Sequence, residues 1–144
     1  MDTGNVKTYD AKMLTITFNG IIVNDFADGD FVTISGLAEN FEYVMGADGS
    51  ENRNNKNIKG ADVVITVSQT STTNDLFSAV HTLDKLSNSG KGGLLIKDLN
   101  GTSILSSGQA YIKGYSDMSF GNSLGTRTWN FRAPNAIVNV GSNL

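Results

Sequence analysis

The chain has no cysteine, one proline and one histidine among its 144 residues, and these shortages exclude several classes of function. Without cysteine there is no disulfide framework and no thiol nucleophile. Because His81 is the single histidine, no multi-histidine metal site can form, and a Ser-His-Asp triad would depend on one residue. His81 also falls inside a predicted helix, where a satisfied or solvent-edge histidine is the ordinary interpretation. We therefore expect no enzymatic activity, no catalytic residue and no cofactor.

Charged side chains are also scarce, and they are unevenly distributed along the chain. They make up 17% of the residues, against roughly 25% in typical globular domains. Residues 1–52 hold nine acids and two bases, a net charge of −7, whereas residues 53–144 hold five acids and nine bases, a net charge of +4. Folding averages such an asymmetry in the ordinary case. The alternative is that faces of opposite charge meet on a neighbouring copy, where they set its orientation.

Three local patterns suggest a ligand-binding site, but each has a simpler explanation or departs from the motif that it resembles. The acids of residues 25–30, DFADGD, are typical of a turn, where Asp side chains bond nearby backbone amides. Residues 48–59 begin like a calcium loop, but Arg53 stands where that loop requires glycine and Lys59 where it requires Glu. The glycines of residues 90–93 follow a helix, whose carboxyl end repels phosphate. We expect no metal site and, without a basic run, no specific binding of nucleic acid.

Long apolar runs are absent too, since no stretch reaches 18 residues. The beginning MDTGNVKTYDAK lacks the basic and apolar blocks of a secretory signal. We expect synthesis in a cytoplasm and no membrane anchor. The length fits one domain, residues 1–144, able to bury roughly 70% of the surface of the unfolded chain.

The apolar residues that are present alternate with polar ones, which predicts a mainly β protein. Leu76, Val80 and Leu83 have helical spacing instead, with Phe77 widening the apolar stripe. The expected fold is an antiparallel β-sandwich or barrel of about eight strands with one α-helix. The expected strands are 14–18, 31–34, 41–45, 61–69, 94–99, 102–105, 109–115 and 128–132, with 21–23 and 136–140 as two further candidates.

The segment 40–59, NFEYVMGADGSENRNNKNIK, passes from a strand into a polar, Asn-rich stretch. Phe41, Tyr43 and Met45 alternate with polar or smaller residues, and the next clear strand is 61–69. We expect these two strands to form a hairpin whose long extended loop is 46–59. Loops of more than about 12 residues are uncommon in compact domains and are usually functional or disordered. This loop is therefore the first candidate for function.

The chain resembles the tail tube proteins of contractile-tailed bacteriophages, and the likeness is centred on this loop. An "F-x-x-V-x-G-x-x-G" stretch precedes the loop, and "V-x-x-S-Q-x-S-x-x-N-D" and a helix follow it. These motifs stand in this chain as Phe41, Val44, Gly46, Gly49, Val67, Ser68, Gln69, Ser71, Asn74 and Asp75. Val67 directly precedes Ser68, so the V-x-x-S spacing of the second motif is not kept. The likeness extends less specifically through the C-terminal strands and covers most of the chain.

The resemblance implies a structural protein that forms hexameric rings, stacked into a hollow tube in the virion tail and assembled in the host cytoplasm. DNA would pass through the lumen without specific binding, along a polar, weakly acidic wall. The loop and the N-terminal segment would reach adjacent subunits, and sheath, baseplate and tail terminator proteins would be further partners. The implied contact loop is Gly46, Asp48, Glu51, Arg53, Lys56 and Lys59, and the implied inter-subunit sheet is Phe41, Tyr43, Val63, Ile65 and Val67.

Two alternatives stay open. The tube of a type VI secretion apparatus or a related contractile injection system has a similar fold and would share these features. A monomeric β-sandwich that binds carbohydrate or protein would use the polar loop as its ligand surface. A stable monomer with an ordered loop would favour the second alternative.

Overall fold

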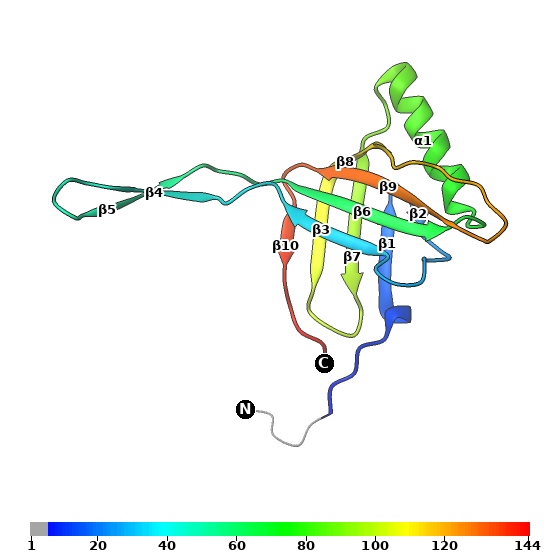
Figure 1. Ribbon diagram of the computed structural model, residues 1–144, viewed down its shortest axis with the longest axis horizontal. Coiled ribbons are helices and arrows are strands. Elements are labelled where there is room, and N and C mark those ends of the chain that lie inside the picture. The colour runs from blue at the N-terminus through cyan, green and yellow to red at the C-terminus, as the bar shows by residue number, and fades with distance from the viewer. Residues whose placement is uncertain (1–5) are drawn as a thin grey trace.

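The structure is a computed structural model that describes residues 6–144, and it shows a β-rich body with one helix and a long projecting hairpin (Figure 1). Residues 1–5, part of the N-terminal segment expected to reach adjacent subunits, lie outside the described residues. The elements in chain order are the short 3-10 helix Ala11–Met13, β1 (Leu14–Phe18), β2 (Ile21–Ile22), β3 (Val32–Gly36), β4 (Phe41–Met45), β5 (Glu51–Asn55), β6 (Ala61–Ser68), α1 (Thr73–Ser87), β7 (Gly92–Asp98), β8 (Ile104–Tyr115), β9 (Thr126–Ala133) and β10 (Ile137–Asn139).

Eight strands form one antiparallel sheet that is folded over along β8. The strand order is β2-β1-β7-β8-β9-β6-β3, and β10 pairs with the beginning of β8. β8 changes its main partner along its length: residues 104–110 pair with β7, and residues 111–115 pair with β9. The two halves of the sheet face each other across the core and do not close into a barrel within the described residues. The predicted fold class, a mainly antiparallel β fold with one helix and a long hairpin, is confirmed.

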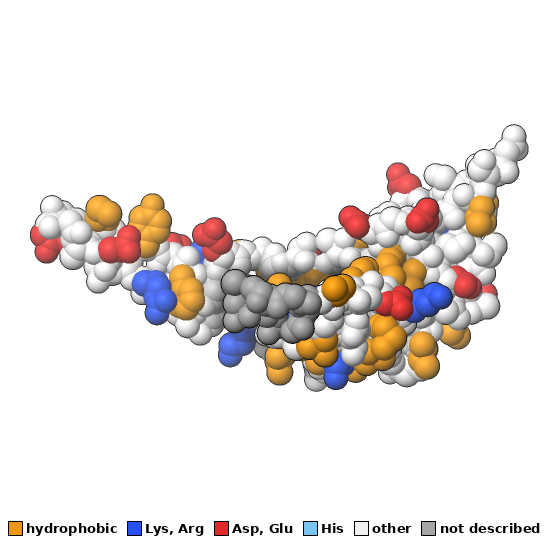
Figure 2. Space-filling view, turned by 90° about the horizontal axis from the view of Figure 1, so that it is seen from below, with side chains coloured by type: hydrophobic (Ala, Val, Ile, Leu, Met, Phe, Trp, Pro, Cys, Tyr) orange, Lys and Arg blue, Asp and Glu red, His pale blue; other side chains and the backbone are white. Residues whose placement is uncertain are grey.

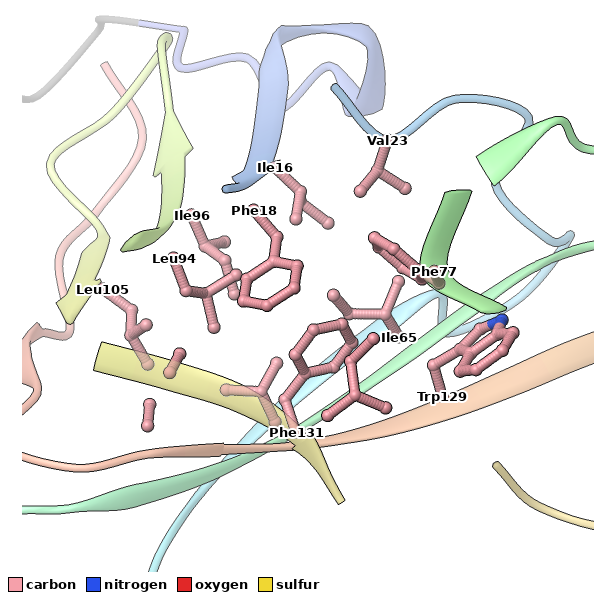
Figure 3. Close-up of a cluster of buried hydrophobic side chains, with 14 of the residues drawn as sticks. Ile16, Phe18, Val23, Ile65, Phe77, Leu94, Ile96, Leu105, Trp129 and Phe131 are labelled. Carbon is pink, nitrogen blue, oxygen red and sulfur yellow. The ribbon is translucent and has the colours of Figure 1, made fainter. Parts of the chain in front are cut away.

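Aromatic side chains join the two halves of the sheet. Phe18 of β1 meets Phe131 of β9 edge to face, with the ring centroids 5.1 Å apart (Figure 3). Both side chains are fully buried, together with alternate residues of β6 and β7. Edge-to-face pairs at this distance stabilise a core beyond the area that they bury. The period-two pattern of the sequence therefore gives one apolar face to each half of the sheet.

Helix α1 covers one end of the body and is held there mainly by Phe77. This side chain is fully buried, and its ring contacts the rings of Phe18, Trp129 and Phe131 edge to face at 5.2–6.1 Å. The side chain of Asn74 accepts a hydrogen bond from the Trp129 indole N–H and donates to backbone carbonyls before the helix. Asn74 therefore ties the beginning of the helix to β9.

The long hairpin differs from its prediction. Phe41–Met45 pairs with Glu51–Asn55, so five residues of the expected loop form a strand and the turn is only 46–50. The strand β6 pairs with β3 and β9, not with β4. β4 and β5 thus extend the β3–β6 hairpin beyond the body. The sequence does not signal β5 because both of its faces are exposed, so its residues need no apolar alternation.

The last strands are also joined differently. The predicted strands 102–105 and 109–115 are parts of the single strand β8. The turn from β7 to β8 has five residues, 99–103, where Asn-Gly at 100–101 favours a two-residue turn. Asp98 organises this wider turn, since its carboxylate accepts hydrogen bonds from the Asn100 N–H and the Asn143 amide.

Candidate assembly surfaces

The projecting hairpin, residues 37–60, is here called the arm. One face of its paired strands carries three apolar side chains of β4, with Asn55, Arg53 and Glu51 of β5 opposite them, and is called the apolar face of the arm. Side chains of Phe41, Tyr43 and Met45 point to that face because alternate residues of a strand share a side. They are 43%, 70% and 61% exposed. Arg53, opposite Tyr43, places its guanidinium 4.1 Å from the centre of the Phe41 ring. Two strands in isolation are marginally stable in water, so burial of this face against another surface would stabilise the arm.

The opposite face of the arm is polar, apart from Val44. An ion pair joins the Lys56 ammonium to the Glu42 carboxylate at 3.3 Å. Both side chains are largely exposed, so this pair contributes about 1 kcal/mol at most. The pair orients the arm strands but does not explain why they project from the body.

The tip of the arm is a compact turn. The Asp48 carboxylate accepts hydrogen bonds from the hydroxyl and the backbone N–H of Ser50, at 2.7 and 3.1 Å, which together lower the pKa of Asp48 below its ordinary value of 3.8. Gly49 follows with φ of 87°, a conformation that side chains disfavour. Asp48 is thus engaged within its own turn, while Glu51 and Arg53 stand on β5.

Three residues of the inter-subunit sheet implied by the resemblance lie in the core instead. Val63, Ile65 and Val67 of β6 are fully buried in the core. Because β6 pairs with β3 on one side and with β9 on the other, it has no free edge for a neighbour. Alternation made β6 the clearest strand of the sequence, but that signal marks a strand with one buried face and does not say whether the strand is central or at an edge. Phe41 and Tyr43, in contrast, lie on the exposed arm.

Two free edges of the body belong to β3 and to the second part of β8. The Thr66 N–H donates to the Phe31 carbonyl at 2.8 Å. Alternation along an antiparallel ladder then turns the N–H groups of Val32, Ile34 and Gly36 away from β6. Pairing of β8 with β7 ends at Ala110, and residues 111–115 pair only with β9 within the described chain. The sequence of β3, VTISG, carries neither the charge nor the proline that usually protects an edge.

The outward face of the β8-β9-β6-β3 half of the sheet is polar and mostly uncharged. Hydroxyls of Thr66 and Thr128 lie side by side, 3.2 Å apart. The charges on this face form one cluster, in which Asp62 accepts from Arg132 at 2.7 Å and from Lys113 at 3.3 Å. Partial burial raises the pKa of Asp62, but these two cations outweigh burial and lower its pKa below 3.8.

An apolar groove opens at the base of the arm, at the end of the body opposite α1. Its volume is about 590 Å³, within the range of roughly 300–1,000 Å³ usual for binding pockets. Seen from below, hydrophobic side chains gather on the body and again along the arm (Figure 2). We call this site the basal groove; its apolar lining includes Val32, Ile34, Leu37, Ile58, Leu105, Ala136, Val138 and Val140.

Helix α1 has a second apolar face that the sheet does not cover. Leu76, Leu83 and Leu86 are 47%, 52% and 81% exposed, and they lie on one side of the helix by their spacing. The apolar face of α1 predicted from the sequence is thus mostly exposed, and Phe77 beside it holds the helix. The described residues contain no cluster of metal-ligating side chains. None of their helices is long and apolar enough to cross a membrane.

Solved structures that are similar to this chain include proteins of phage-like particles. The chain is similar to a protein of the anti-feeding prophage tube-terminating cap, with a TM-score of 0.61 and 12% identity over 96% of this chain and 95% of that one. It is similar to a protein of the sheath-tube complex of an extracellular contractile injection system, with a TM-score of 0.61 and 13% identity over 92% and 91% of the two chains. A protein of the virion of a native gene transfer agent gives a TM-score of 0.61 and 11% identity, over 95% and 99% of the two chains.

These likenesses show that the chain shares its fold with proteins of such particles. No family model matches the chain. Structural protein ORF10 of Pseudomonas phage KPP10 is 30% identical over 148 residues, which cover 97% of this chain and 86% of that protein. The chain belongs to the family of this phage structural protein. The predicted class, a phage structural protein, is confirmed at this level, while its role as a tail tube stays a prediction.

Proposed function

We propose that the chain is a non-enzymatic structural subunit of the inner tail tube of a contractile phage tail, located in the virion. Copies would form hexameric rings that stack into a DNA-conducting channel. The observation that carries this proposal is the pair of free edges, β3 and the second part of β8, at the two ends of one four-stranded half-sheet. Membership in a phage structural family and the shared fold support it.

The directions of the four strands suit a ring. Because β8, β9, β6 and β3 are antiparallel to their neighbours, the first and last strands of this half-sheet run in opposite directions. A head-to-tail rotation keeps every copy in the same orientation. It therefore sets β3 of one copy antiparallel to β8 of the next. Each edge offers five residues, 32–36 and 111–115, so four strands per copy would form one continuous barrel.

The position of the rest of the molecule favours one face of the half-sheet for the lumen. The core, the other half-sheet and α1 all lie on the core-facing side of β6 and β9. Because a closed ring has more room on its outside, this side would lie on the outside of the ring. The lumen would be lined by the polar outward face, with Thr66 and Thr128 at its middle. With this face as the lumen, the wall would not be weakly acidic as the resemblance implies, since Asp62 is outnumbered by Lys113 and Arg132. Asp62 nevertheless pairs with both cations, which limits their hold on phosphates.

The arm would supply contacts beyond the ring. Its candidate contact residues are Gly46, Asp48, Glu51, Arg53, Lys56 and Lys59, with Phe41 and Tyr43 on the apolar face. Individual exposed ion pairs are weak, but a ring repeats each contact in every copy. Sheath, baseplate and tail terminator proteins are the further partners that this role requires. The exposed leucines of α1 are available for them.

A second candidate is the tube of a contractile injection system. The similarity to a protein of an extracellular contractile injection system favours it, although that similarity concerns the fold. Neighbouring genes discriminate between the two: capsid and terminase genes indicate a phage, and secretion ATPase and effector genes indicate the other system. A monomeric binding module is less favoured, because it gives the unprotected edge of β3 no role.

Electron microscopy of negatively stained protein, with light scattering over a concentration series, tests the proposal. We expect hollow rings or stacked tubes and a mass that rises with concentration. A monomer at every concentration would contradict self-assembly.

A matched pair of proline variants links assembly to the β3 edge. Ile34→Pro removes an N–H that faces away from β6, so the monomer should fold while rings fail to close. Ile22→Pro is the control: Val23 bonds to Ile16, so the Ile22 N–H also faces away from its partner strand, at the other end of the sheet. We expect assembly to survive Ile22→Pro. Equal assembly of both variants would refute the edge-pairing arrangement.

A further inference from the structure

The arm and the basal groove are two unpartnered apolar surfaces on the same chain. β4 and β5 pair only with each other within the described residues, so the apolar face of the arm lacks support from its own body. The groove is lined by side chains such as Ile34 and Val138, which are 39% and 45% exposed. Each surface presents what the other needs: bulky side chains on the arm, and apolar walls at the groove.

The arm cannot fill the groove of its own subunit. Leu37, Ala38, Ile58, Lys59 and Gly60, the base of the arm, themselves form one wall of the groove. From this wall the arm leads away from the body (Figure 1). Tyr43 lies six residues beyond Leu37, roughly 20 Å of extended strand. The occupant that the geometry allows is thus the arm of another copy.

We propose that the apolar face of the arm, Phe41, Tyr43 and Met45, docks into the basal groove of a neighbouring copy. The inference rests on the proposed self-assembly and names the two surfaces that meet. A second copy is the occupant because identical chains supply arms and grooves in equal numbers. Under the rotational symmetry of a ring, this contact passes from each copy to the next.

The chemistry of the two surfaces favours docking of particular arm side chains into the groove. Tyr43 is the most exposed aromatic residue of the arm strands, and buried aromatic anchors dominate the energy of many interfaces. The Arg53 guanidinium covers the Phe41 ring and leaves Tyr43 and Met45 for the partner. The groove gives apolar contacts on several sides, and its lining also includes Lys59 and Asp98. Arg53 and Glu51, which lie opposite Tyr43 and Met45 on this face, can pair with these two charges of opposite sign.

Cysteine cross-linking tests the contact, because the natural chain has no cysteine. The test variant is Tyr43→Cys with Val138→Cys, and the control is Tyr43→Cys with Ile22→Cys, since Ile22 is exposed on β2. Assembled particles, verified by microscopy, are treated with a short bis-maleimide. We expect a ladder of linked copies on a denaturing gel for the test variant and far less for the control.

The outcomes separate this inference from the proposed function. Particles that form with equal linkage of both variants would overturn the groove docking and leave tube assembly standing. Absence of particles for the natural chain would overturn both. A second measurement compares Tyr43→Ser with Val44→Ser, on the opposite face of the arm. The first should raise the concentration needed for assembly at least about tenfold, and the second should not; equal effects would also overturn the docking.

Discussion

Replacement of Phe77 by alanine should remove much of the stability of the monomer while it leaves the surface of α1 intact. Phe77 is fully buried and meets three other aromatic rings edge to face. Phe→Ala changes in cores cost about 3–5 kcal/mol of unfolding free energy. Because three aromatic pairs are lost together, we expect the upper part of that range.

The size of this loss is large against the stability of an ordinary domain, about 5–15 kcal/mol. One kcal/mol corresponds to roughly 2–4 °C in Tm for a chain of this size. We therefore expect Phe77→Ala to lower Tm by roughly 10–20 °C. Urea and thermal unfolding, followed by circular dichroism and by the fluorescence of Trp129, measure it. Trp129 is the single tryptophan and lies against Phe77, with centroids 5.7 Å apart.

Leu83→Ala is the matched control on the same helix. Leu83 is 52% exposed, so its truncation should cost less than about 1 kcal/mol. The reasoning is refuted if Phe77→Ala costs less than about 1 kcal/mol, or if both variants lose the same stability.

Three further predictions concern charge and the arm. Because the pKa of Asp62 is lowered in the folded state, its ionised carboxylate stabilises the fold above about pH 4, and this stabilisation is lost as the pH falls through that pKa. Asp62→Asn should therefore reduce the fall of the urea midpoint between about pH 5 and 2. An unchanged dependence of the midpoint on pH would contradict this prediction. Changing Arg53, Lys56 and Lys59 to Glu should preserve the circular dichroism spectrum and weaken assembly, and unchanged particle yield at moderate salt would count against the arm. Amides of residues 46–59 should exchange hydrogen much faster than those of β6 in the monomer, because β4 and β5 pair only with each other within the described residues. Strong protection of these amides would contradict the expectation that the arm is mobile before assembly.

The sequence predicts the body of the fold well because each central strand has one dry face. Alternation in β1, β6 and β9 follows from burial of Phe18, Ile65 and Phe131, and the same pattern appears in the linear sequence. β5 leaves no such pattern, since its polar residues pair through the backbone with both faces in solvent. Residues 46–59 of the arm were therefore expected to form a loop.

The candidate surfaces were predicted only in part, for a related reason. Apolar spacing identifies α1 but cannot say whether Leu83 or Phe77 faces the core, since both belong to one broad stripe. Alternation also cannot distinguish a central strand from an edge, so Val67 was assigned to an interface when it belongs to the core. Strand order, which decides the free edges, depends on pairings between distant segments that local patterns do not record.

A cryo-electron microscopy reconstruction of assembled particles tests the central claim, a tube built by joining half-sheets, most directly. We predict a closed ring in which β3 of one copy lies antiparallel to residues 111–115 of the next, about 4.8 Å apart, with Thr66 and Thr128 facing the lumen. A particle whose copies meet without strand pairing at these edges, or whose lumen is lined by another face, would contradict it.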